Sequence, residues 1–210
     1  MDAAGLDAAV LRATRRSLHA VAELLIAGPQ YREHGTIRLA VTPGGIGGTA
    51  TPTRIDGTDL VWSGGRMPLR GSYADVAAAA GIALGAPVGV YADTSGVEGD
   101  EQLAVDPDAV ALMLGWFAAG DDALRTFAPA VTPILWPEHF DLGIALDDVN
   151  YGVSPGDADS PRPYAYVGPW QPRTGAFWNA SFGAWRHDGE LPTAQSITDF
   201  FAEGRREAAS

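Results

Sequence analysis

The chain of 210 residues contains no cysteine and no lysine. Without cysteine, it has no disulfide, no thiolate nucleophile, no cysteine-bound zinc and no cysteine-bound iron–sulfur cluster. Without lysine, it has no amine for Schiff-base chemistry or for covalent pyridoxal phosphate, and no lysine for a phosphate-binding P-loop. These two absences exclude several classes of covalent and metal chemistry before any motif is considered.

Positive charge is also scarce, because 14 basic residues face 26 acidic ones and the formal net charge is −12. Phosphate affinity requires clustered positive charge, so we expect no nucleic-acid partner. Arg12, Arg15 and Arg16 form one basic patch, which we interpret as the solvated face of a helix. Apolar runs of membrane-spanning length and an export signal are not seen, so we expect no membrane span and a cytoplasmic location.

Hydrophobic periodicity predicts one α+β domain over 1–210. The predicted helices lie at 4–27, 73–84, 106–120, 121–127 and 193–207, with Gly28-Pro29 ending the first and Gly120 breaking the third. The predicted strands lie at 36–42, 67–70, 86–92, 135–146, 164–168 and 176–185, and a hairpin is predicted over 54–62. We therefore expect an antiparallel sheet of about six to eight strands with the helices packed mainly on one side.

The stretch 133–185 holds four of the six tryptophans and three of the six tyrosines. Large rings with polar edges, set among a few oriented polar groups, are typical of small-molecule pockets. The candidate ligand-binding residues are Trp136, Asn150, Asp157, Tyr164, Tyr166, Trp170, Trp178 and Asn179. The alternative interpretation is that each ring is an ordinary core residue.

His139 and Asp141 are the candidate catalytic residues of this stretch. On a strand, residues two apart point to the same face, so a strand over 135–146 places both side chains together. A histidine held by a carboxylate is a plausible general base. The favoured hypothesis is therefore a small organic ligand bound in an aromatic-lined cleft that contains this pair.

A metal-dependent enzyme is the rival hypothesis, with His139, Asp141 and His187 as a set of two histidines and one carboxylate. In the favoured hypothesis no cofactor is predicted. A third possibility is a structural or partner-binding protein, which predicts an exposed apolar patch in place of an enclosed pocket. The sequence does not predict an oligomeric state.

Two formal motif matches fail on physical grounds. Gly152-x-Ser154-x-Gly156 fits the nucleophile elbow of hydrolases, but the next residue, Pro155, has no N–H to donate to an oxyanion. We interpret it as a turn. The stretch 45–50 fits the dinucleotide-binding glycine pattern, but Thr51 and Pro52 do not open the helix that this motif requires.

The whole chain resembles an uncharacterised family of actinobacterial hypothetical proteins. The segments that carry the resemblance are LWPEHFDL (135–142), NYGVSPGD (150–157), PYAYVGPW (163–170) and FWN (177–179), with weaker similarity at 36–45 and 200–206. A looser likeness joins it to another family of unknown function, whose members carry a His-Phe-Asp strand and a Pro-Gly-Asp turn. The resemblance implies an intact fold and a bacterial, cytoplasmic setting, without a reaction or a cofactor.

Overall fold

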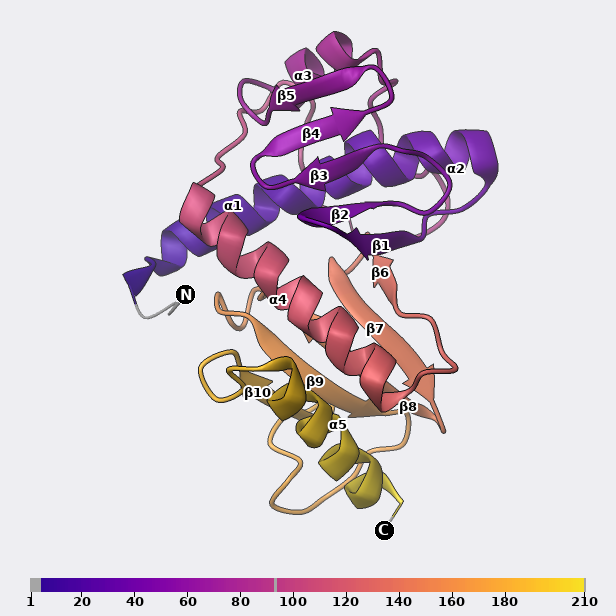
Figure 1. Cartoon of the computed structure of the whole chain (residues 1–210), viewed down its shortest axis with the longest axis vertical. Coiled ribbons are helices and arrows are strands. Elements are labelled where there is room, and N and C mark those ends of the chain that lie inside the picture. Colours follow the sequence, from indigo (N-terminus) through magenta and orange to yellow (C-terminus); the bar gives the residue numbers. More distant parts are fainter. Residues whose placement is uncertain (1–4, 93, 210) are drawn as a thin grey trace.

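The computed structural model describes residues 5–92 and 94–209 (Figure 1). In these residues the strands form one antiparallel sheet, in the order β10-β9-β8-β7-β6-β1-β2-β3-β4-β5. Their bounds are β1 Leu39–Thr42, β2 Gly45–Gly48, β3 Arg54–Asp56, β4 Asp59–Trp62, β5 Gly65–Pro68, β6 Ile134–Trp136, β7 Asp141–Leu146, β8 Val149–Ser154, β9 Tyr164–Pro169 and β10 Ala184–His187. The expected α+β fold is confirmed, and the ten strands exceed the six to eight that the sequence predicts.

The helices are α1 Ala8–Val21, η2 Ala22–Ala27, α2 Gly28–His34, α3 Tyr73–Ala80, α4 Pro107–Phe127 and α5 Ala194–Ala208. Side-chain caps begin four of them: Asp7 for α1, Ser72 for α3, Asp106 for α4 and Thr193 for α5. Among the described residues, no helix has the length and apolar character needed to cross a membrane.

The order of elements is the same in the two halves of the chain. Helices α1 to α2 precede the meander β1–β5, which α3 follows; α4 precedes the meander β6–β10, which α5 follows. The two meanders meet at the centre of the sheet, where Leu39 of β1 pairs with Leu135 of β6. Figure 1 shows them as the upper and lower parts of the molecule.

One face of the sheet is apolar from β3 to β9. Strand register places these buried side chains on the same face: Leu39, Ile46, Ile55, Leu135, Leu142, Val153 and Val167. Segment η2 contacts β2 and β3, α4 contacts β1, β2, β7 and β8, and α5 contacts β8 and β9. These helices form the core with that face, so η2, α4 and α5 leave the opposite face of β7–β9 uncovered.

The predicted end of the first helix at Gly28-Pro29 is wrong. The helix continues through the π-helical segment η2 into α2, and Gly28 donates its N–H to Glu23 O across the widened turn. Pro29 then lies in the first turn of α2, where its missing N–H is not needed. The predicted start at residue 4 lies outside the described residues.

The predicted break at Gly120 is also wrong, because α4 continues to Phe127. Any side chain at Gly120 would collide with Val153 of β8, so this glycine allows α4 to lie close against the sheet. Close packing, rather than a helix end, explains the residue. Similarly, α3 is shorter than predicted and ends at Gly81, which adopts a left-handed conformation with φ of 68°.

Three predicted strands have different bounds or are absent. The strand over 135–146 is two strands, β6 and β7, joined by a turn at 137–140 in which Phe140 has φ of 52°. Residues 176–183 form turns and a bridge, so only 184–187 is a strand. The described residues of 86–92 form no strand. Alternating apolar residues predicted strands in all three cases, but glycine and proline turns interrupt the pairing.

Candidate functional site

A cavity of 1180 Å³ lies between α1 and the face of β7–β9 that η2, α4 and α5 leave uncovered. Its floor is formed by Asp141 of β7 and Tyr164 and Tyr166 of β9, and one wall is formed by the arginines of α1. The turn 137–140 and Ser95 close further sides. The cavity therefore collects residues from the first quarter, the middle and the last third of the chain.

Tyr166 lies across β8 and donates its hydroxyl to Asp141 Oδ2 on β7. This reach depends on Gly143 and Gly152, which face each other across the strand pair. A Cβ at Gly152 would lie 2.5 Å from Tyr166 Cζ, and one at Gly143 would lie 3.0 Å from its hydroxyl. The two glycines thus provide the space in which the ring lies against the sheet.

The Asp141 carboxylate is buried, and its second oxygen, Oδ1, has no hydrogen-bond partner among the described residues. Burial raises the pKa of Asp141, while the Tyr166 hydroxyl and the nearby His139 oppose the rise. Burial and the adjacent carboxylate raise the pKa of Tyr166 well above its ordinary value. Tyr166 therefore remains a hydrogen-bond donor at any physiological pH.

Glu138 and His139 belong to the turn before β7, not to a strand. The expectation that His139 shares a strand face with Asp141 is therefore wrong, and no hydrogen bond joins these two side chains within the described residues. Both nevertheless line the cavity, with His139 exposed. Glu138 Oε2 is buried and, like Asp141 Oδ1, has no partner in the described chain.

His19 of α1 holds this turn in place. Its Nε2 lies 2.6 Å from Pro137 O, and its ring stacks on Phe140 with centroids 5.3 Å apart. Because the carbonyl can only accept, Nε2 carries the proton. Burial lowers the pKa of His19, which keeps the ring neutral. The sequence predicts only a partly buried packing residue here.

Arg12 and Arg16 are exposed, as predicted for a solvated helix face, whereas Arg15 is half-buried, and all three line the cavity. Arg15 donates to Gly156 O at 2.6 Å, and burial lowers its pKa. Arg16 pairs with Glu101 at 2.7 Å. The helical spacing of these arginines is visible in the sequence, but nothing in it indicates what they face.

Asp157 and Tyr164 form a second polar group of the site. The Tyr164 hydroxyl donates to Asp157 Oδ2 at 2.5 Å, and Asp157 Oδ1 accepts from the N–H groups of Asp159 and Ser160, each at 2.8 Å. Burial and this hydrogen bond raise the pKa of Tyr164. The carboxylate of Asp157 is thus already occupied by donors of the chain.

Ser154 is the last residue of β8, so the turn predicted for 152–156 begins only after it. Its hydroxyl lies 3.2 Å from the N–H of Gly156 and 3.1 Å from the oxygen of that residue, and Gly156 has φ of 108°. The glycine-serine-glycine spacing therefore produces a turn that presents Gly156 O to Arg15.

The mouth of the cavity is aromatic. Trp170 is 59% exposed and Phe182 is 46% exposed, and both line the cavity. Trp170 donates its indole N–H to Asn150 Oδ1 at 3.2 Å. Phe182 was not among the predicted site residues, because its segment was read as a strand rather than as a loop beside β9.

The cavity brings together seven of the predicted site residues: His139, Asp141, Asn150, Asp157, Tyr164, Tyr166 and Trp170. Three others lie elsewhere. Trp136 is in the short strand β6, Trp178 packs edge-on against Phe177 with centroids 4.9 Å apart, and Asn179 bonds the backbone of Trp185. These three have structural rather than cavity-lining positions.

The predicted metal-ligand set is not assembled. His187 lies on β10 beside Trp185, with ring centroids 5.0 Å apart, and does not line the cavity that contains His139 and Asp141. In the part of the chain that the structure describes, no group of three histidine, aspartate or glutamate side chains lies close enough to hold a metal ion.

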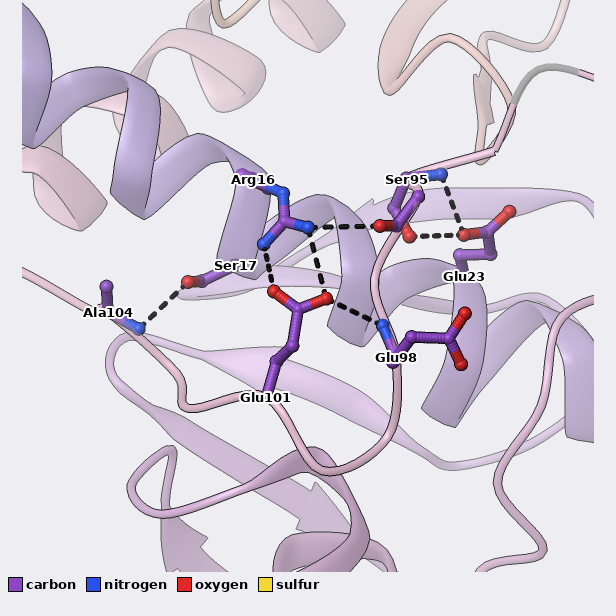
Figure 2. Close-up of polar contacts among 8 residues, drawn as sticks. Arg16, Ser17, Glu23, Ser95, Glu98, Glu101 and Ala104 are labelled. Atoms are coloured by element: carbon purple, nitrogen blue, oxygen red, sulfur yellow. Dashed lines mark hydrogen bonds and ion pairs between the residues drawn. The ribbon is translucent and has the colours of Figure 1, made fainter.

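An irregular segment, residues 94–104, carries Ser95 to the cavity and is fixed by polar contacts (Figure 2). Glu23 of η2 is 1% exposed and accepts from Ser95 N–H at 2.9 Å and from Ser95 Oγ at 2.5 Å. The Tyr91 hydroxyl donates to it as well, at 3.2 Å. Further along, Ser17 Oγ accepts from Ala104 N–H at 2.9 Å. Nothing in the residues around Glu23 indicates that this side chain is buried.

Comparisons of the chain with protein-family models, with curated proteins and with solved structures found no match. The geometry of the cavity is therefore the basis for any proposal about function.

Proposed function

We propose that this protein binds a small organic molecule in the cavity between α1 and β7–β9. The observation that carries the proposal is the pair of buried acceptors, Asp141 Oδ1 and Glu138 Oε2, in the wall of a 1180 Å³ space. A buried polar atom without a partner costs about 1–3 kcal/mol. A donor on a bound molecule removes this cost.

The dimensions and lining of the cavity support the same proposal. Ligand pockets typically measure about 300–1,000 Å³, and this cavity, at 1180 Å³, is slightly larger. Such pockets combine apolar walls with a few oriented polar groups. Here Trp170 and Phe182 supply apolar surface at the mouth, and Asp141 is oriented by Tyr166. His139 is exposed at the rim of the cavity, which supports a contact with the ligand.

The two rival functions have less support. A metal-dependent enzyme requires ligands that the described residues do not assemble. A partner-binding surface requires a broad exposed apolar patch. The large apolar side chains that are exposed in the described chain are Val88, Val90, Trp170 and Phe182. Two of these four belong to the cavity mouth, which favours a ligand site.

A thermal-shift screen of a metabolite library tests the proposal, because a compound that binds only the folded form raises the melting temperature. At about 100 times its Kd, a ligand stabilises the fold by about 2.7 kcal/mol. Hits should lose their shift in Asp141→Asn and in His139→Ala, and keep it in the distant control Arg125→Gln. If no compound shifts the wild type, or if every shift persists in both cavity variants, the proposal is wrong.

A further inference from the structure

We infer that the ligand carries a protonated nitrogen at one end and an anionic group at the other. This inference rests on the proposed binding function and specifies the chemistry of the molecule bound. It follows from the separation of charge in the cavity wall, where carboxylates lie at the turn 137–140 and the start of β7, and guanidinium groups lie on α1.

The end of the cavity that carries the carboxylates of Glu138 and Asp141 requires a positively charged donor on the ligand. Asp141 Oδ2 is occupied by the Tyr166 hydroxyl, so Oδ1 and the nearby Glu138 Oε2 remain as acceptors. Two neighbouring carboxylates disfavour each other's charge, and Glu138 does act in this direction on Asp141. A hydroxyl of a ligand would satisfy one oxygen and leave the repulsion. An ammonium group donates to both oxygens and neutralises the charge.

The opposite wall retains unused donors for an anion. Arg16 is neutralised by Glu101, but Arg12 and Arg15 form no ion pair with the described residues. Arg15 uses one N–H for Gly156 O, whereas a guanidinium has five donors. Two arginines one helical turn apart on α1 suit a carboxylate or a phosphate, which guanidinium groups bind in a bidentate manner.

The acidic side chains near the α1 wall do not take up the remaining donors of Arg12 and Arg15. Asp157, the carboxylate that acts most strongly on Arg15, already accepts from the Tyr164 hydroxyl and from two backbone N–H groups. Asp159 also lines the cavity, but its side chain is exposed at the rim. The arginine donors that face the cavity interior are therefore open to a ligand.

Isothermal titration calorimetry with two matched probe sets tests the inference on the full chain. The first set is L-phenylalanine, 2-phenylethylamine and 3-phenylpropionate; the second is L-tryptophan, tryptamine and indole-3-propionate. Within each set the apolar body is kept and one charge is removed. In at least one set, we expect the zwitterion to bind about tenfold or more tightly than both singly charged analogues, since charge-assisted hydrogen bonds are lost in each analogue.

Substitutions test which residues bind the protonated nitrogen of the ligand and which bind its anionic group. The change Glu138→Gln together with Asp141→Asn should reduce the zwitterion's affinity to that of the carboxylate probe, and Arg12→Gln together with Arg15→Gln should reduce it to that of the amine probe. Arg125→Gln, which breaks an exposed contact to Asp121, is the matched control. Circular dichroism and thermal unfolding of every variant identify any that fail to fold. For such a variant, the matching single substitutions replace it.

The outcomes distinguish this inference from the proposed function. If neither zwitterion binds more tightly than both of its analogues, or if the variants weaken all probes of a set equally, the inference is wrong. A neutral metabolite that requires Asp141 for its thermal shift would also overturn the inference, but would leave the proposed function standing. Only the failure of the library screen removes both.

Discussion

The meanders β1–β5 and β6–β10 follow the same order of elements, yet they differ on the face that the helices leave uncovered. On the first meander this face carries Arg54, Asp56, Asp59 and Arg66, which form ion pairs with one another. On the second meander it carries Asp141 and Tyr166, with one carboxylate oxygen buried and unpaired in the described chain. The helix-covered faces of both are mainly apolar, although Arg186 of β10 pairs with Glu203 of α5 on the second.

This difference separates the residues that stabilise the fold from those that define the site. Apolar side chains under η2, α4 and α5 give both halves a core, and a face of exposed ion pairs adds little stability. A buried carboxylate with an unpaired oxygen opposes folding, and we propose that binding rather than stability accounts for the one at Asp141.

The largest effect is expected at Glu23, which connects the two halves. Its helix covers β2 and β3, while Ser95, which it holds, lines the cavity over β7–β9. The change Glu23→Ala leaves the Ser95 N–H and two hydroxyls without their acceptor, so we expect a loss of about 3 kcal/mol in the free energy of unfolding. Urea denaturation measures it.

The matched control for this prediction is Glu98→Ala. Glu98 is exposed on the same segment, and its N–H, rather than its side chain, contacts Glu101 at 2.8 Å. Its removal should cost less than about 0.5 kcal/mol. Equal losses in the two variants would show that the buried contacts of Glu23 do not fix the segment.

The next effect concerns the glycines beneath Tyr166. A Cβ at Gly152 collides with this ring and lies 2.6 Å from the Leu142 oxygen, so Gly152→Ala should cost about 1–3 kcal/mol and displace Tyr166 from Asp141. At Gly168, on the same sheet face, the nearest atom would be 3.5 Å away, so Gly168→Ala should be tolerated. Unfolding curves and ligand affinity test the pair. Equal changes in stability and ligand affinity in the two variants would mean that Gly152 does not hold Tyr166 in position.

A smaller change in the free energy of unfolding, in this case a stabilisation, is expected for Asp141→Asn. Because burial raises the pKa of Asp141, the native state binds this proton more tightly than the unfolded state. Its contribution to stability is therefore greatest below the unfolded pKa near 3.8 and is lost as pH rises through the native pKa.

At neutral pH the neutral amide should thus stabilise the fold by about 1 kcal/mol, because an unpaired buried amide costs less than an unpaired charge. The advantage should vanish at low pH, while ligand affinity falls at neutral pH. Unfolding of both proteins at a series of pH values measures the difference. A variant that is less stable than the wild type at neutral pH would contradict the sign.

The sequence predicted those features that depend on neighbouring residues. Alternation and helix periodicity predicted the antiparallel sheet and the single covered face, and the fold confirms both. Pro155 argues against a hydrolase elbow at Ser154, and in the structure the Ser154 hydroxyl contacts the backbone of Gly156. Tyr166 and Asp141 were singled out because of their residue types, although a straight strand over 135–146 was the wrong reason for placing Asp141.

Features that depend on distant segments could not be predicted in this way. Nothing local to Arg15 indicates that residue 156 will lie against it, and nothing near Glu23 indicates that residue 95 will. The role of Gly152 is likewise set by a ring from the next strand. In addition, Phe140 has a positive φ that is unusual for a large side chain, and this places His139 in a turn.

The smallest effect is expected on the uncovered face of the first meander. Arg66 lies near Asp56 and Asp59, but its side chain is about half exposed, and ion pairs of this kind contribute roughly 0–1 kcal/mol. Arg66→Ala should therefore change the free energy of unfolding by less than about 1 kcal/mol and leave ligand affinity unchanged. Urea denaturation at low and high salt, together with titration of any hit from the screen, measures both. A loss of affinity would mean that the two meanders are coupled through the sheet, and that the uncovered face of the first meander is not separate from the site.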